Sequence, residues 1–214
     1  MKTALLLLAW ALTAQASFFP DGGPRLKAQK LFVDPQRAQV AERLLTNFHQ
    51  RLAPLVNAQG AQLVVIPKWE DERVNALASR VPGVWKIEVF GGLLNHPELD
   101  DDELTLVLCH ELGHHLGGTP TASRQGWSAC EGQADYWSAS ACASLLHDPE
   151  STALRLTRMY ASQAGGSWPD LALSDETRVD RTFYGYPKAQ CRLDTLLAGL
   201  KGMDRPACWY YSPK

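Results

Sequence analysis

The amino-acid sequence predicts a single α+β domain, mainly helical, with a small antiparallel or mixed sheet beside a helical body. Its 214 residues allow one domain with a substantial core but not two comfortable ones. Two short segments in the first half of the chain have the apolar pattern of strands, and helical spacing of apolar residues dominates the second half. No internal repeat or low-complexity tract indicates another architecture.

The first predicted helix covers residues 36–52. Asp34 is suited to cap its N-terminus, and Pro35 follows at the first helical position, where a missing N–H costs nothing. Apolar residues then recur at intervals of three and four, which is the spacing of one helical face. They are Val40, Leu44, Leu45, Phe48 and Leu52.

Two strands are predicted after this helix. Residues 62–66 form a short apolar, β-branched run that ends at Pro67. Residues 85–90 alternate between apolar and polar side chains, which is typical of a half-buried strand, and Gly91 and Gly92 end it. These segments predict the small sheet.

The second half of the chain is predicted as helices separated by loops that contain Gly and Pro. One of the aspartates at 100–102 caps the first of them, and Gly117 with Gly118 ends it. Residues 165–187 are predicted as a loop. The other three helices are expected at about 129–146, 148–163 and 188–200.

Residues 1–16 have the pattern of a signal peptide. Lys2 is a positive n-region, residues 4–12 are an apolar h-region, and Ala14-Gln15-Ala16 fits the small-x-small cleavage site. The apolar run is too short to span ~30 Å of hydrocarbon. The sequence therefore predicts export, to the periplasm or outside the cell, as a mature chain without a transmembrane segment.

Cleavage after Ala16 would leave an extended N-terminal arm, residues 17–34, in front of one domain at residues 35–214. The arm is rich in Pro, Gly and charged residues, and it is either a flexible terminus or a segment that occludes a cleft. The net charge of −2 comes without a basic stripe, which argues against a nucleic acid as partner. No pattern specifies an oligomeric state.

Export places the cysteines in an oxidising compartment, where one or two disulfides and one remaining thiol are expected. Cys191 and Cys208 form the preferred pair because both lie in the C-terminal segment. Cys109 is expected to be unpaired, as a small apolar residue on a buried helix. The five cysteines are Cys109, Cys130, Cys142, Cys191 and Cys208.

The sequence His110-Glu111-Leu112-Gly113-His114 is an HExxH motif on a predicted helix. Residues four apart share a helix face, so His110 and His114 can bind one zinc ion. Glu111 lies about 100° around the helix, beside the metal, where a general base for zinc-bound water must stand. The buried setting favours this interpretation, since unpaired His and Glu side chains would be costly there.

A third ligand is expected from the following helix. Pro120 stands where the metzincin pattern needs a further histidine, so that class is excluded. Glu131 and Asp135 form an acid pair one turn apart: Glu131 is predicted to bind the zinc, and Asp135 to accept the second N–H of a ligating histidine. Asp135 itself, His115 and His147 remain as rival ligands.

These residues resemble the gluzincin peptidases of the HtpX and CAAX-prenyl-protease family, which includes the soluble periplasmic BepA. The central match is HExxH with Glu131 and Ala134-Asp135. Tyr186-Pro187 followed by Arg192 resembles a later family motif, with tyrosine in place of its histidine. Weaker matches precede the motif, at residues 75–76, 87–89, 92–94, 103–104 and 107–108.

The resemblance implies a zincin-like fold, one Zn²⁺ per chain and Glu131 as third ligand. It also implies that a protein or peptide substrate binds as an extended strand, with Glu88 to Phe90 at the cleft edge. Tyr186 could donate to an oxyanion, and Arg192 is expected to pair with Asp135 or Glu131. The sequence thus predicts a zinc endopeptidase with Glu111 as the base. A non-catalytic, zinc-containing exported protein with a binding or chaperone-like role is the alternative.

Overall fold

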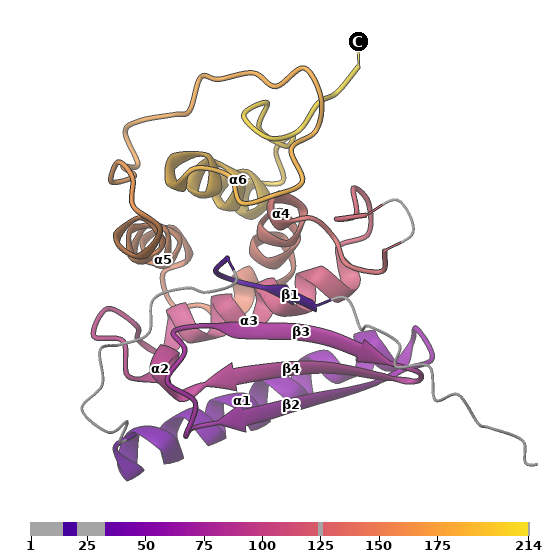
Figure 1. The fold of residues 1–214 in the computed structure, drawn as a ribbon, viewed down its shortest axis with the longest axis vertical. Helices are drawn as coiled ribbons and strands as arrows, with labels where there is room; N and C mark the ends of the chain where they lie inside the picture. Colours follow the sequence, from indigo (N-terminus) through magenta and orange to yellow (C-terminus); the bar gives the residue numbers. More distant parts are fainter. Residues whose placement is uncertain (1–14, 21–32, 124–125, 214) are drawn as a thin grey trace, which may run out of the picture.

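The computed structural model describes residues 15–20, 33–123 and 126–213. Within them the chain is an α+β domain in which a four-stranded mixed sheet lies beside helices, so the predicted fold class is confirmed (Figure 1). The described elements are β1 (Gln15–Ser17), α1 (Pro35–Asn57), β2 (Gln62–Lys68), β3 (Ala76–Val81), β4 (Val84–Phe90), α2 (Gly91–Leu94), α3 (Asp101–Leu116), α4 (Glu131–Cys142), the 3₁₀ turn η1 (Ala143–Leu145), α5 (Pro149–Ala164) and α6 (Ala189–Lys201).

The sheet has the strand order β1-β3-β4-β2. β2 runs parallel to β4, whereas β3 is antiparallel to both β4 and β1. Helix α1 contacts β2, and α3 contacts β3, β4 and α1. Helices α4, α5 and α6 pack on the far side of α3, so α3 lies between the sheet and the rest of the helical body (Figure 1).

The helix boundaries follow from local chemistry. The Asp34 carboxylate accepts hydrogen bonds from the backbone N–H groups of Gln36 and Arg37 at 2.9 and 3.0 Å, as expected of an N-cap. Helix α1 continues past the predicted end to Asn57, because its apolar face still packs on the core through Ala53 and Val56. Asp100 caps α3, and a reciprocal bond from its N–H to the Glu103 carboxylate completes a capping box.

Two strands were not predicted. β3 contains small residues that are buried on both faces from Ala76 to Ser79, so it lacks the alternation that marks a half-buried strand. β1 joins the predicted end of the leader to the start of the arm and has no apolar pattern of its own. Both strands become ordered only through pairing: Ala16 lies opposite Ala78, and Ser17 opposite Leu77.

The prediction that Glu88 to Phe90 lie at the cleft edge is wrong. These residues belong to β4, which is hydrogen-bonded to β3 on one side and to β2 on the other. A strand with both sides paired has no free N–H and C=O row for a substrate. The two outermost strands of the sheet are β1 and β2, and β1 covers the side of β3 that β4 leaves open.

The expectation for Cys109 is also wrong. Cys109 on α3 is bonded to Cys142 at the end of α4, because these two helices pack along each other. The predicted Cys191–Cys208 bond is present, and Cys130 is the free, buried cysteine. Sequence position alone gave no sign that residues 33 apart would meet across a helix pair.

None of the described helices has the length and apolar character needed to cross a membrane. The division into a leader at residues 1–16, an arm and a domain stays a prediction. Most of the leader and arm, residues 1–14 and 21–32, lies outside the described residues.

Candidate metal centre

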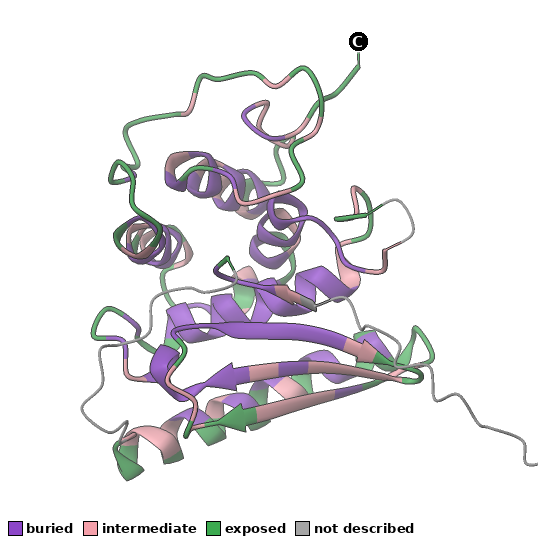
Figure 2. Ribbon diagram, viewed as in Figure 1, coloured by how far each residue is buried: buried purple, intermediate pink, exposed green. Residues whose placement is uncertain are grey.

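Helix α3 is buried along nearly all of its length, and it carries the HExxH motif in its last turns (Figure 2). Helix α4 begins at Glu131 and crosses α3 at the motif. The His110 Nε2 atom lies 3.1 Å from His114 Nε2 and 3.2 Å from an oxygen of Glu131. The other Glu131 oxygen is 3.7 Å from His114 Nε2. Each histidine thus lies near a different oxygen of the Glu131 carboxylate. One ligand atom each from His110, Glu111 and His114 can also be chosen within 4.8 Å of one another.

This spacing fits a zinc ion. Atoms bound at ~2.0–2.1 Å to a tetrahedral ion lie roughly 3.3 Å from one another, which is close to all three observed separations. A His₂Glu set of nitrogen and carboxylate donors is also a typical ligand set of catalytic zinc. The donor chemistry and the spacing both match the group that the motif implies.

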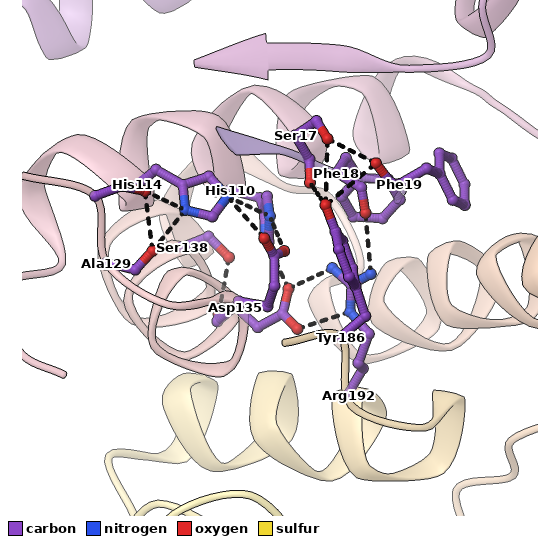
Figure 3. A network of polar contacts seen from close by, with 12 residues as sticks. Ser17, Phe18, Phe19, His110, His114, Ala129, Asp135, Ser138, Tyr186 and Arg192 are labelled. Carbon is purple, nitrogen blue, oxygen red and sulfur yellow. Dashed lines mark hydrogen bonds and ion pairs between the residues drawn. The ribbon is translucent and has the colours of Figure 1, made fainter. Parts of the chain in front are cut away.

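The outer nitrogens of the two histidines are held by acceptors. His110 Nδ1 lies 2.7 Å from an Asp135 oxygen, and His114 Nδ1 lies 2.8 Å from the carbonyl of Ala129 (Figure 3). A carbonyl can only accept, so His114 donates from Nδ1 and, as a neutral ring, presents a lone pair at Nε2. Burial also lowers the pKa of His114 well below its ordinary value, which favours that neutral form.

Asp135 links the metal centre to α6. Its two oxygens accept bonds of 2.8 Å each from Nε and Nη2 of Arg192, and both side chains are buried (Figure 3). Burial alone would raise the pKa of Asp135, but Arg192 and His110 outweigh it and hold that pKa well below its usual range. For His110, burial is likewise outweighed, and the Asp135 and Glu131 carboxylates raise its pKa to about 9.

Glu111 is fully buried beside these donors. Neither of its oxygens has a hydrogen bond of ordinary geometry among the described residues. Burial raises the pKa of this carboxyl to about 8, although His110 and the backbone N–H groups of Ala78 and Phe18 oppose the rise. Burying a carboxylate without a full set of hydrogen-bond partners lowers the stability of the fold. Such a group is therefore a candidate for a role in a reaction.

The rival third ligands lie in other surroundings than Glu131. The imidazole of His147 is exposed and bonded to Asp102, at the other end of α3 from His114. His115 lies between the rings of Trp85 and Trp127, and Arg80 bonds its Nδ1 atom. Asp135 faces the outer nitrogen of His110 rather than its Nε2 atom.

A second group of residues at the centre comes from the start of the chain. Ser17, Phe18 and Phe19 are buried, and the Phe18 ring meets the His110 ring edge-on at 5.2 Å between centroids. The Tyr186 hydroxyl donates to the Ser17 carbonyl at 2.8 Å (Figure 3). Sequence reasoning did not place these residues here. The only available signal was a pair of phenylalanines within an otherwise polar, Pro- and Gly-containing segment.

Gly113 allows α3 and α4 to approach closely. A Cβ at this position would lie 2.7 Å from the backbone oxygen of Ala134, which cannot yield without moving α4. We expect Gly113→Ala to destabilise the protein by roughly 1–3 kcal/mol, as overpacking does, and to weaken metal binding because Glu131 moves with α4. Chemical denaturation and zinc titration measure the two effects. Ser140→Ala, at an exposed position on α4, is the control, and equal stability of the two variants would contradict the close-approach argument.

The comparisons with known proteins support the same family. Residues 39–125, which include the HExxH motif, match the model of Peptidase family M48. The resemblance is thereby confirmed at the level of an M48 gluzincin metallopeptidase family, whose members depend on zinc, and no subfamily is distinguished. Neither the curated proteins nor the solved structures gave a match to this chain.

Proposed function

We propose that this chain, which matches the model of Peptidase family M48 in residues 39–125, is a zinc-dependent endopeptidase in which His110, His114 and Glu131 hold one metal ion. The observation that carries this proposal is that the Nε2 atoms of His110 and His114 lie 3.1 Å apart, each within 3.7 Å of one oxygen of the Glu131 carboxylate, with the buried carboxylate of Glu111 alongside. A bound zinc ion supplies a Lewis acid that polarises a carbonyl and acidifies water.

The side chains of this chain perform the remaining steps. Glu111 takes a proton from the attacking water and delivers it to the leaving nitrogen of the peptide. Tyr186 donates a hydrogen bond to the substrate carbonyl oxygen, where negative charge develops. Burial raises the pKa of Tyr186, and the nearby Glu131 and Glu111 carboxylates add to the rise, so its hydroxyl keeps its proton and remains a donor.

Asp135 and Arg192 act through His110. The carboxylate fixes the ring orientation of His110, and Arg192 keeps the carboxylate ionised and in place. Export to the periplasm or the exterior is part of the proposal. It is supported by the leader pattern in residues 1–16 and by two disulfides, which persist in oxidising compartments.

Metal analysis tests the ligand set. Glu131→Ala removes one of three proposed ligands, so we expect the purified protein to lose its zinc, measured by elemental analysis after dialysis. His147→Ala removes the exposed histidine that bonds Asp102, and it should retain one zinc per chain. Zinc retained by Glu131→Ala and lost by His147→Ala would reverse the assignment. Zinc bound without hydrolysis of a broad peptide library would favour the non-catalytic binding protein.

A further inference from the structure

The N-terminal segment Ala16–Phe19 lies along the side of β3 that β4 leaves open, and it borders the metal centre. Ala16 and Ser17 pair antiparallel with Ala78 and Leu77 of β3, and the backbone then bends at Phe18 and Phe19 (Figure 1). Strand addition to an edge is the general way in which an extended peptide docks on a sheet. The segment therefore occupies the position that a peptide substrate of this centre needs.

The carbonyl groups of Ser17, Phe18 and Phe19 each accept a hydrogen bond from a side chain of the domain. Tyr186 donates to the Ser17 carbonyl at 2.8 Å and also lies 3.2 Å from the Phe19 carbonyl and from the Ser17 hydroxyl. Nη1 of Arg192 donates to the Phe18 carbonyl at 3.3 Å. The Asn75 amide accepts from the Phe19 N–H at 2.9 Å and donates to the Phe19 carbonyl at 3.1 Å.

The Phe18 side chain fills a closed pocket. It is 2 % exposed, with the Arg192 guanidinium 4.5 Å from its ring centroid and the Tyr160 ring 6.4 Å away. His110 forms another wall, as its contact with Phe18 shows (Figure 3). Aromatic rings and a guanidinium group favour an aromatic side chain between them. We therefore expect this site to prefer a substrate with an aromatic residue directly after the bond that faces the metal centre.

The bond between Ser17 and Phe18 is the one placed for reaction. Its carbonyl oxygen accepts a hydrogen bond from the Tyr186 hydroxyl, and its N–H belongs to Phe18, whose ring lies against the proposed ligand His110. The three proposed ligands are at most 7 % exposed with the segment in place. Another peptide can reach the centre only after the segment leaves.

We propose that Ala16–Phe19 is a built-in substrate and that the zinc-loaded protein hydrolyses its own Ser17–Phe18 peptide bond. Water adds its oxygen to the Ser17 carbonyl carbon, the C–N bond breaks, and Glu111 transfers the proton from water to the Phe18 nitrogen. The products are a carboxylate at Ser17 and an amine at Phe18, and no other reactant is consumed. This inference rests on the proposed peptidase function and concerns the chain that still carries Gln15 and Ala16, since cleavage after Ala16 would leave only Ser17 ahead of the bond. Release of the cut strand opens β3 to other peptides.

Intact-mass analysis of the full chain tests the cleavage. Full-length protein that retains residues 1–16 is purified with a chelator and given zinc, and we expect the wild type to shorten to a chain that begins at Phe18. Glu111→Gln should keep its N-terminus. Phe18→Ala should cleave at least about tenfold more slowly, because the pocket loses its occupant. Pro20→Ala changes an exposed neighbour and should match the wild type.

The same samples are assayed with a general peptide library. Wild-type protein that hydrolyses library peptides but keeps its Ser17–Phe18 bond would overturn the self-cleavage and leave the peptidase function standing. Absence of both reactions would overturn both. A cleavage rate that does not change with protein concentration is expected, because the segment and the centre belong to one chain.

A binding measurement tests the docking without catalysis. In the Glu111→Gln background we expect a labelled peptide Ala-Ser-Phe-Phe-Pro to bind about tenfold more tightly when Phe18→Ala is added, since the chain's own segment then competes less. Phe18→Leu, which keeps an apolar side chain, should fall between the two, and circular dichroism checks that each variant is folded. Equal affinities in all folded variants would show that the segment does not occupy the substrate position.

Discussion

Glu111→Gln is expected to abolish peptide hydrolysis while zinc stays bound. A general base contributes about 10²–10⁴-fold to such reactions, and glutamine has the shape of glutamate but cannot accept the proton. The side chain is fully buried beside the proposed ligands, and the amide adds no bulk that would displace them. Steady-state hydrolysis of a peptide and elemental analysis of the same preparation measure both quantities.

Glu103→Gln is the matched control for this change. Glu103 is also a fully buried carboxylate of α3, but it lies about two turns away, where it accepts from Arg155 at 2.6 Å. We expect its replacement to leave hydrolysis unchanged. Equal activity of Glu111→Gln and wild type would remove Glu111 from the reaction, whereas loss of zinc from Glu111→Gln would indicate that it acts as a ligand.

Asp135→Asn is expected to have the largest effect on stability. The change leaves the buried Arg192 guanidinium without its charged partner, and breaking such a pair costs about 3–5 kcal/mol. It also removes the acceptor that orients His110, which should weaken zinc binding about 10–100-fold. Chemical denaturation of the metal-free protein and zinc titration separate these two effects.

Two further variants define the Asp135 result. Glu150→Gln breaks an ion pair with Lys201 in which both side chains are about half exposed, and it should cost at most about 1 kcal/mol. Adding Arg192→Met to Asp135→Asn removes the unpaired charge, so the double variant should be more stable than Asp135→Asn alone. A double variant that is less stable would show that Arg192 stabilises the fold mainly through other contacts.

The elements that could be predicted are those encoded by neighbouring residues. Asp34-Pro35 and Asp148-Pro149 mark helix starts because an N-cap and a proline act on the next turn of backbone. The HExxH motif places His110 and His114 on one helix face for the same local reason. The approach of Glu131 to these two histidines could also be predicted, because α4 is the helix that follows α3 in the chain.

The features that could not be predicted depend on contacts between distant segments. β3 and β1 exist as strands because they pair with each other and with β4, and neither carries a periodic pattern. Cys109 meets Cys142 only once α3 and α4 are packed. The position of Phe18 against His110 likewise requires the sheet edge, the metal helix and α6 to be assembled first.

The Cys109–Cys142 bond joins the same two helices that carry the proposed ligands. Cys109 immediately precedes His110, and Cys142 ends the helix that begins at Glu131. In many small metal sites the ion itself must gather ligands from an unfolded chain, so loss of the ion unfolds the protein. Here a covalent link joins the two helices independently of the metal, so we expect the metal-free protein to keep the proposed ligands near one another. Once this bond has formed, zinc would bind to a site whose two helices are already joined.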